Sequence, residues 1–183
     1  MADLSGMRVL ILATDGFEQD ELLDPRSALL DAGAQVTLAS LKRDPIVGEK
    51  HGRKGASITP DTTIDRIDTE LFDALVLPGG VTNPDRLRMD DRAVAIVEEF
   101  MEDDKVVAAI CHGPWLLAEA DVLEGRRVTS WPSIRTDLSN AGASVLDEQV
   151  VVDGNLITSR KPDDIPAFNE AVIAALQEER VVH

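Results

Sequence analysis

The stretch VVAAICHGPWLLAEA, residues 106–120, decides the fold of this chain. Its first five residues are small or β-branched and apolar, which is typical of a buried parallel strand. Cys111 and His112 follow at once, and Pro114 stands where a helix tolerates proline, near its first turn. The stretch therefore predicts a strand, a sharp turn and a helix, with a reactive side chain at the turn, as in a nucleophile elbow.

The same alternation of strand and helix continues on both sides of this stretch. Gly33 follows an amphipathic segment at the place where a C-cap glycine belongs. Alternating strands and helices predict an α/β sandwich with a mostly parallel central sheet, in which active sites lie at the carboxyl ends of strands. We expect strands at 7–13, 35–40, 74–78 and 106–110, and helices at 21–32, 91–101 and 114–120.

The remaining segments predict smaller elements. Residues 42–66 carry glycine, proline and charge with weak alternation, which indicates a small β-hairpin, and a second hairpin is expected at 150–158. Residues 85–88 are expected to form a solvated loop. A short strand is expected at 127–130, and helices at 133–141 and 162–179.

Length and composition exclude several classes of protein. The 183 residues, 44% of them hydrophobic, suit a single domain spanning 1–183. A formal net charge of −16 argues against binding to nucleic acid or to an anionic membrane surface. One cysteine cannot form an internal disulfide, and no apolar run approaches the ~20 residues of a membrane span. We expect a cytoplasmic protein without a signal peptide.

Cys111 is the first candidate for chemistry. At a strand end and helix start, its thiol would meet the positive end of a helix dipole and several free N–H groups, which lower the pKa of a thiol. The alternative is an inert buried cysteine.

His112 is adjacent in sequence, so its imidazole reaches the thiol only if the turn bends sharply. It is either a base, which needs an orienting group, or a residue that caps the helix. The backbone N–H of His112, together with one from Gly79-Gly80, could form an oxyanion hole.

Glu18 lies just after the first strand. Its spacing from Asp15 fits a capping box, and spacing alone favours that interpretation. The functional alternative has Glu18 point across the strand ends toward Cys111 and share a proton with the sulfur.

No motif for a nucleotide, metal or other cofactor is present, so we expect none. His51 and His183 are expected to be solvated, and three scattered histidines with one cysteine do not predict a zinc site.

Six motifs taken together are more specific than any one of them. They are DGFEQDEL (15–22), FDALVLPGG (72–80), NPDRLR (83–88), AAICHGPWLL (108–117), TSWPS (129–133) and SRKPDD (159–164). With these motifs the chain closely resembles the PfpI subgroup, of the general-stress-protein type, in the superfamily that also contains the Parkinsonism-associated deglycase and the class I glutamine amidotransferases. The resemblance covers residues 6–176 and implies a flavodoxin-like three-layer sandwich.

The resemblance also implies residue roles. Cys111 matches the nucleophile, and Glu18 is taken as the protonated carboxyl that hydrogen-bonds the thiolate, which reverses the capping preference. The backbone N–H groups of Gly80 and His112 match the oxyanion hole. His112 matches the base of a Cys–His–acid triad, with Asp85 of a neighbouring subunit as the acid. The site would then exist only in a homodimer or a higher homo-oligomer, up to a hexamer.

The function that this resemblance implies is a cofactor-independent, cysteine-dependent stress-response enzyme. It would act on reactive carbonyls, such as methylglyoxal or its protein adducts, in the manner of a glyoxalase or deglycase. The alternatives are an intracellular cysteine peptidase and a non-enzymatic oxidation sensor or holdase chaperone. The expected partners are a small carbonyl or glycated-protein substrate, with no nucleic acid and no membrane.

Overall fold

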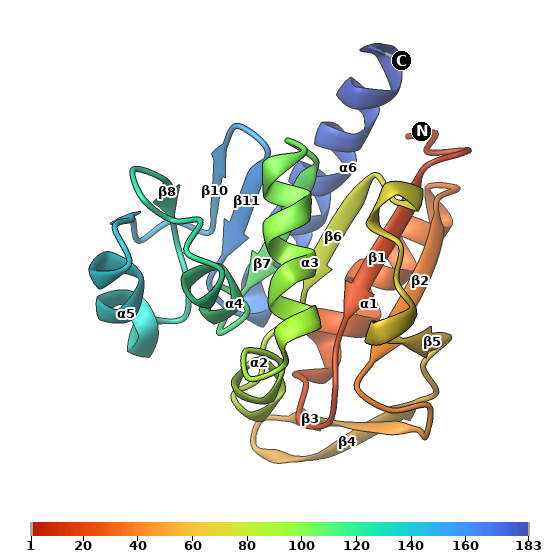
Figure 1. Cartoon of the computed structure of the whole chain (residues 1–183), viewed down its shortest axis with the longest axis horizontal. Coiled ribbons are helices and arrows are strands. Elements are labelled where there is room, and N and C mark those ends of the chain that lie inside the picture. Colours follow the sequence, from red (N-terminus) through yellow and green to blue (C-terminus); the bar gives the residue numbers. More distant parts are fainter. Residues whose placement is uncertain (1, 183) are drawn as a thin grey trace.

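A seven-stranded sheet runs through the middle of the computed structural model, which describes residues 2–182 (Figure 1). Its strands are ordered β10-β11-β7-β6-β1-β2-β5, and all neighbours are parallel except β10 and β11. The predicted mostly parallel sheet is therefore confirmed. The strands are β1 (Arg8–Leu12), β2 (Gln35–Ser40), β5 (Thr62–Thr63), β6 (Ala74–Leu77), β7 (Val106–Ile110), β10 (Val150–Asp153) and β11 (Leu156–Ser159).

Helices cover both faces of the sheet and complete a three-layer sandwich (Figure 1). Helices α1 (Gln19–Asp31) and α6 (Ile165–Val182) pack on one face, and α3 (Asp91–Glu102) and α4 (Trp115–Glu119) on the other. Asp90 is the N-cap of α3, and its side chain accepts a hydrogen bond from the N–H of Ala93. The expected alternation of strands and helices thus places the central sheet between two layers of helices.

Alternation within the strands builds the two cores. Leu10 and Leu12 of β1 belong to the core under α3 and α4, whereas Val9 and Ile11 belong to the core under α1 and α6. Successive side chains of a strand point to opposite faces, so a strand buried on both sides has to be apolar throughout. This is why the strand segments are continuous apolar runs in the sequence.

The hairpin expected within residues 42–66 is confirmed. It consists of β3 (Ile46–Lys50) and β4 (Arg53–Ile58), joined by His51 and Gly52 with φ of +51° and +73°. The hairpin crosses below the carboxyl ends of the central strands (Figure 1). Backbone hydrogen bonds tie it to the loop after β1, among them Glu49 N–H to Phe17 O at 2.7 Å.

Two sequence-based expectations about local structure are wrong. Residues 85–88 were expected to form a loop, but α2 (Thr82–Leu87) covers most of them, because the buried Asn83 side chain bonds the carbonyls of Pro78 and Gly79 and anchors the first turn. The capping box at Asp15 does not form either. Asp15 instead accepts a hydrogen bond from the N–H of Val47, and Glu18 is the residue at the N-cap of α1.

Several short elements lie outside the central sheet. The strand expected at 127–130 is β8 (Arg127–Val128), which pairs with β9 (Ser144–Val145) beside α5 (Arg135–Asn140). The helices expected at 133–141 and 162–179 each begin with a 3-10 turn. The 3-10 turns are η1 (Ile64–Arg66), η2 (Thr69–Leu71), η3 (Pro132–Ile134) and η4 (Pro162–Asp164).

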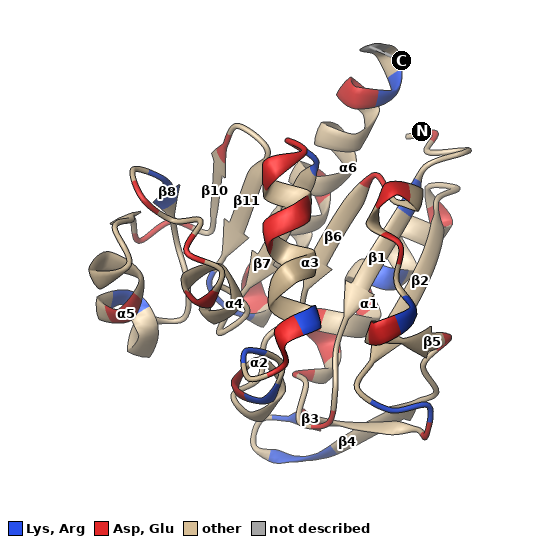
Figure 2. Ribbon diagram, in the orientation of Figure 1, with Lys and Arg blue, Asp and Glu red and all other residues tan. Residues whose placement is uncertain are grey.

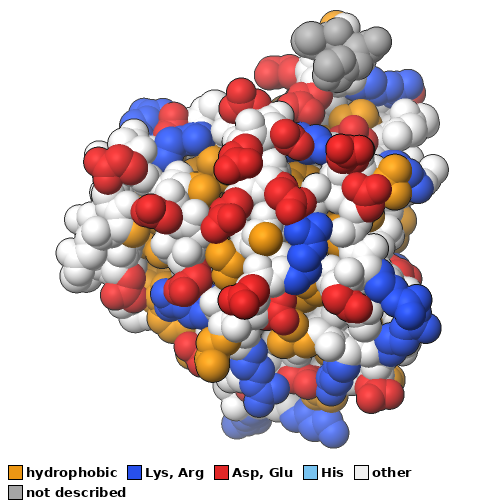
Figure 3. All heavy atoms as spheres, in the orientation of Figure 1, with side chains coloured by type: hydrophobic (Ala, Val, Ile, Leu, Met, Phe, Trp, Pro, Cys, Tyr) orange, Lys and Arg blue, Asp and Glu red, His pale blue; other side chains and the backbone are white. Residues whose placement is uncertain are grey.

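The negative charge is spread unevenly over the surface. Acidic residues gather on α3, while basic residues lie on α2 and on the β3–β4 hairpin (Figure 2). The space-filling view of the same face shows acidic groups over its upper part and basic groups along its lower edge (Figure 3). Among residues 2–182, no helix is long and apolar enough to cross a membrane.

Candidate active site

Cys111 stands at a sharp turn between β7 and α4. Its φ is +63°, a left-handed conformation that costs a non-glycine residue free energy and marks functional turns. Its N–H donates to Ser159 O at 3.0 Å, and its carbonyl accepts from Trp131 N–H at 2.9 Å. The expected elbow is therefore present, and neighbouring strand ends and loops hold it in its strained conformation.

A buried carboxyl group lies against the thiol, and it belongs to Glu21. Glu21 is fully buried in the first turn of α1, where Oε2 accepts the Gly79 N–H at 2.9 Å. A Cβ built on Gly79 would lie 2.5 Å from Glu21 Oε2 and 2.6 Å from Cys111 Cβ, so the two side chains face each other across a glycine. A side chain at Gly79 would fill the space in which they meet.

The titration of Glu21 and Cys111 is coupled. Burial, and next the nearby negative charge of Glu18, raise the pKa of Glu21 to about 8. Burial and an ionised Glu21 raise the pKa of the Cys111 thiol, while hydrogen bonds from backbone N–H groups lower it. Two negative charges this close are unfavourable, so the carboxylate and the thiolate are not both present at neutral pH. The sequence-based expectation of a lowered thiol pKa is therefore wrong for this structure, because burial and the charge of Glu21 outweigh the backbone N–H groups.

Two backbone N–H groups point at the sulfur. They belong to Gly80, with φ of +81° at the turn after β6, and to His112 at the start of the helical turn. These are the two N–H groups that the sequence proposed for an oxyanion hole. Both donate to the Cys111 side chain and so favour a negative charge at that place.

His112 reaches the thiol despite being its sequence neighbour. Its Nδ1 lies 3.2 Å from Cys111 Sγ, and its Nε2 lies 3.3 Å from Ser133 Oγ. Only 6% of the residue is exposed, and burial lowers the pKa of the imidazole. The left-handed turn at Cys111 supplies the bend that this contact requires.

Glu18 is not the carboxyl beside the sulfur; Glu21, one helical turn further along, takes that place. Glu18 stands at the N-cap of α1 and makes no side-chain capping bond. Its Oε1 is buried without a hydrogen-bond partner, and partial burial raises its pKa. Glu18 therefore lines the same cavity as Glu21, but Glu21 is the carboxyl group that faces the sulfur.

Asp85 does not reach His112 within its own chain. It is exposed on α2. Within the chain, the hydrogen-bonding partner of His112 Nε2 is Ser133 Oγ. The expected contact with a neighbouring subunit stays a prediction.

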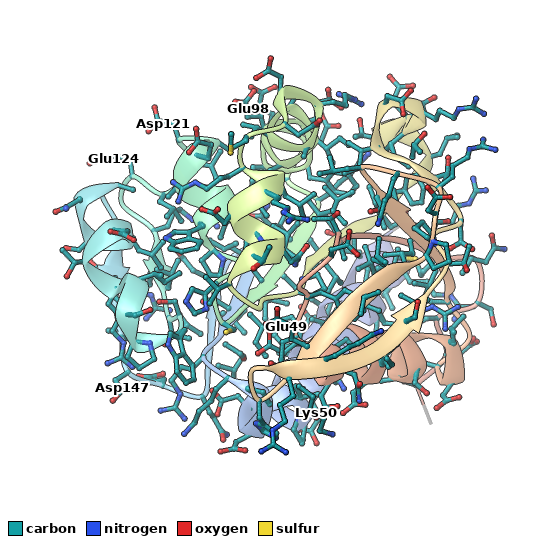
Figure 4. All side chains as sticks on the ribbon, turned by 90° about the horizontal axis from the view of Figure 1, so that it is seen from below. Glu49, Lys50, Glu98, Asp121, Glu124 and Asp147 are labelled. Carbon is teal, nitrogen blue, oxygen red and sulfur yellow. The ribbon has the colours of Figure 1, made fainter. Side chains whose placement is uncertain are left out.

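The thiol opens into a cavity of about 430 Å³ at the carboxyl ends of the strands. The β3–β4 hairpin forms one wall, and its residues Glu49 and Lys50 lie near the hairpin tip (Figure 4). Among residues 2–182, no group of three acidic, histidine or cysteine side chains is arranged to hold a metal ion. The wall residues that the argument uses are Glu18, Glu21, His51, Gly80, Cys111, His112 and Trp131.

Sequence reasoning missed three residues that shape this site. Glu21 carried a signal, because it is a charged residue at helical spacing from buried Pro25 and Leu29. Ser133 carried none, because His112 lies 21 residues away in the sequence. Asn83 carried none either, because its Thr14 partner lies 69 residues away and its bonds to Pro78 and Gly79 require the folded turn after β6. Asn83 Oδ1 accepts from Thr14 N–H at 2.8 Å and links the end of β1 to the Gly79-Gly80 turn.

The fold and the site together define an α/β protein with a cysteine at a strand–turn–helix elbow, beside a buried carboxyl group and an imidazole. The family model described as the DJ-1/PfpI family matches residues 7–175, and the chain belongs to that family. The predicted resemblance is thereby confirmed.

Relatives in this family have names that agree with an enzyme linked to stress. General stress protein 18 of Bacillus subtilis is 45% identical over 173 residues, which cover 94% of this chain and 99% of that protein. "Deglycase PfpI" of Pyrococcus furiosus is 42% identical over 93% of this chain and all of its own length. "Putative cysteine protease YraA" of Bacillus subtilis is 43% identical over 93% of this chain and 98% of its own.

The crystal structure of Drosophila melanogaster DJ-1beta has the same fold. It superposes with a TM-score of 0.86 at 30% identity and covers 97% of this chain and 91% of its own. The predicted flavodoxin-like sandwich is thus confirmed by comparison as well as by topology.

Proposed function

We propose that this chain is a stress-related cysteine enzyme that acts on reactive carbonyl compounds, such as methylglyoxal or its adducts with proteins. One observation supports the proposal above the others. A carboxyl group, an imidazole and two backbone N–H groups surround the sulfur of Cys111 in one cavity. A thiol so surrounded is suited to attack an electrophilic carbon.

The state of Glu21 decides whether the sulfur can attack. With its pKa raised to about 8, Glu21 is mostly protonated at neutral pH. A neutral carboxyl removes the charge that opposes thiolate formation, and its O–H can donate to the sulfur. The thiolate then accepts hydrogen bonds from Glu21, Gly80 N–H and His112 N–H.

The first chemical step is the addition of the thiolate to the carbonyl carbon. A carbon–sulfur bond forms, the π bond of the carbonyl breaks, and its electron pair moves to the oxygen. The N–H groups of Gly80 and His112 lie beside the sulfur and are suited to donate to that oxygen. Conversion of methylglyoxal and water to lactate oxidises one carbon and reduces its neighbour, so it needs no external redox cofactor.

The size of the cavity favours a small substrate. About 430 Å³ accommodates a three-carbon carbonyl compound or a modified side chain, and Cys111 at its floor is only 6% exposed. A folded polypeptide would have to unfold locally into an extended segment before one of its backbone carbonyls could enter the cavity and reach this sulfur. The deglycase name of the Pyrococcus furiosus relative agrees with a carbonyl substrate.

A cysteine peptidase is the second candidate. The name of the Bacillus subtilis relative YraA favours it, and addition of a thiolate to a carbonyl is the first step of that reaction too.

We further propose that the active enzyme is a homo-oligomer in which Asp85 faces His112 of a neighbouring subunit. Asp85 is exposed on α2, with exposed Val81 one helical turn before it and Met89, 82% exposed, one turn after it. Such a face is suited to contact between subunits.

A comparison of three substrates tests the reaction class. The enzyme is incubated with methylglyoxal, with the methylglyoxal adduct of N-acetylarginine, and with unmodified peptides. We expect many turnovers per subunit on at least one carbonyl compound, measured as lactate or as released N-acetylarginine. Cleavage of peptides without turnover of either carbonyl compound would overturn the proposal in favour of the peptidase.

A further inference from the structure

The imidazole of His112 is held on three sides by residues of its own chain. Trp131 stacks on the ring with the centroids 6.1 Å apart, and Trp115 meets it edge-on at 5.1 Å. Ser133 Oγ lies 3.3 Å from Nε2. Among residues 2–182, Ser133 supplies the hydrogen-bonding partner of Nε2, and Cys111 that of Nδ1. The ring is thus fixed at both nitrogens and on two faces.

The segment that carries two of these contacts is tied to the elbow itself. Trp131 donates its backbone N–H to the Cys111 carbonyl at 2.9 Å, and the 3-10 turn η3 then brings Ser133 back toward the imidazole. The loop that is bonded to the elbow therefore also carries Ser133, an exposed residue whose hydroxyl group reaches the imidazole.

Trp115 is fixed just as firmly. Its indole Nε1 donates to Asp137 at 2.9 Å, and Arg88 lies 5.3 Å over its ring. Arg88 is in turn held by an ion pair with Glu119 at 3.1 Å. The imidazole therefore packs against a side chain that has little freedom to move.

We infer that Ser133 is a positioning residue for His112, which it holds with the Nε2–H form of the ring so that Nδ1 is free to take the proton of the Cys111 thiol. In this step the S–H bond breaks and an N–H bond forms at Nδ1, which leaves a thiolate and an imidazolium. Throughout, Nε2–H donates to Ser133 Oγ. The use of the thiolate rests on the proposed function, whereas the contacts of the imidazole do not depend on it.

The hydroxyl group of Ser133 orients the ring without adding a charge beside it, and burial already favours the uncharged ring. In the assembly proposed above, Asp85 of the neighbouring subunit would add its charge near a ring that Ser133 has already oriented. The charged or titratable groups around the ring include Cys111, Glu21 beyond the sulfur, and Arg88 with Asp137 around Trp115. The same cavity is lined by Glu18, Glu49, His51, Lys161 and Asp163.

The test compares Ser133→Ala with Ser133→Thr, which restores the hydroxyl. Ser139→Ala on α5 is the matched control, because that side chain is exposed and lies on the helix that follows Ser133. The first readout is the ¹⁵N spectrum of the histidine rings, which is simple because the chain has three histidines. The second is the pH profile of iodoacetamide labelling, which reports on Cys111 alone because it is the single cysteine.

We expect the wild-type ring to carry its proton on Nε2 and the Ser133→Ala ring to show a mixture of the two tautomers. We expect labelling near pH 7 to slow by about three- to tenfold in Ser133→Ala, the fold-change that a hydrogen bond of ordinary strength supplies. Ser133→Thr should recover most of the loss, and Ser139→Ala should show none.

An unchanged spectrum and labelling profile in Ser133→Ala would overturn the inference, as would a wild-type ring protonated on Nδ1 or a failure of threonine to rescue. Neither readout requires a substrate. If methylglyoxal is not turned over while the two readouts change as expected, the proposed reaction fails and the role of Ser133 stands.

Discussion

The carboxyl group of Glu21 and the sulfur of Cys111 face each other across Gly79, whose N–H binds Glu21 Oε2 at 2.9 Å. The strand order places β1, β6 and β7 side by side, so the helix after β1, the turn after β6 and the elbow after β7 converge at one edge of the sheet. The reactivity of the thiol therefore depends on where a single proton resides between two side chains from different segments.

Replacement of Glu21 by alanine should raise the pKa of Cys111. In the proposed mechanism a protonated Glu21 donates its O–H to the thiolate, and the variant loses that donor while the sulfur stays buried. We expect the pH profile of iodoacetamide labelling to shift to higher pH and the labelling rate near pH 7 to fall by about tenfold or more, the scale of one charge-assisted hydrogen bond. Glu18→Ala is the matched control. A larger shift in Glu18→Ala than in Glu21→Ala would show that the sequence-based assignment of Glu18 was right.

Replacement of Glu21 by glutamine should change how stability depends on pH. The folded pKa of about 8 lies above the unfolded value of ~4.3, so the folded chain keeps a proton that the unfolded chain releases. The contribution of Glu21 is therefore fully present below about pH 4 and is lost as the pH rises toward 8.

Glutamine has no proton to lose, so the variant should gain stability relative to wild type by up to about 1.4 kcal/mol per pH unit across that range. Urea unfolding at several pH values measures the difference, with Glu98→Gln at an exposed position of α3 as the control. Stability curves that stay parallel from pH 5 to pH 8 would contradict the raised pKa of Glu21.

Asn83→Ala should destabilise the fold by about 2–4 kcal/mol. The buried side chain donates to the carbonyls of Pro78 and Gly79 and accepts from Thr14 N–H, so its loss leaves buried backbone groups without partners. Urea unfolding measures the loss, and Asn140→Ala at an exposed helix end should stay within about 0.5 kcal/mol of wild type. A loss for Asn83→Ala no greater than that of Asn140→Ala would show that the turn after β6 does not need this anchor.

Complementation between subunits tests the proposed assembly. If Asp85 acts on His112 of a neighbour, Cys111→Ala and Asp85→Ala should each be inactive, and their mixture should recover activity once subunits exchange. The recovered sites are those that pair an intact Cys111 with an intact Asp85. Activity of a monomer in sedimentation, or no recovery despite demonstrated exchange, would exclude an acid supplied in trans.

The fold could be predicted because buried parallel strands leave continuous apolar runs, and because Gly33 and Pro114 mark helix boundaries. The strand β5 has only two residues, too few to show a periodic pattern in the sequence. Helix α2 forms because the Asn83 side chain bonds to the backbone of Thr14, which is distant in the sequence, and of Pro78, which lies before the turn. Short elements held by tertiary contacts have no local signal.

The sequence predicted which segments meet at the candidate site, but it did not predict every residue of the site. Cys111, His112 and Gly80 lie together because they follow adjacent strands. The choice between Glu18 and Glu21 depended on where α1 begins, and a start at Gln19 turns the later residue toward the sulfur. Ser133 comes to His112 from a segment whose path only the folded chain fixes.

The most direct test of the central claim is the number of substrate molecules that one subunit converts with and without the Cys111 sulfur. Wild type and Cys111→Ser are incubated with an excess of methylglyoxal, and lactate is counted per subunit. If the Cys111 thiolate attacks the carbonyl, wild type should form many molecules of lactate per subunit and Cys111→Ser should form none above the uncatalysed rate. Turnover by Cys111→Ser equal to that of wild type would contradict the account.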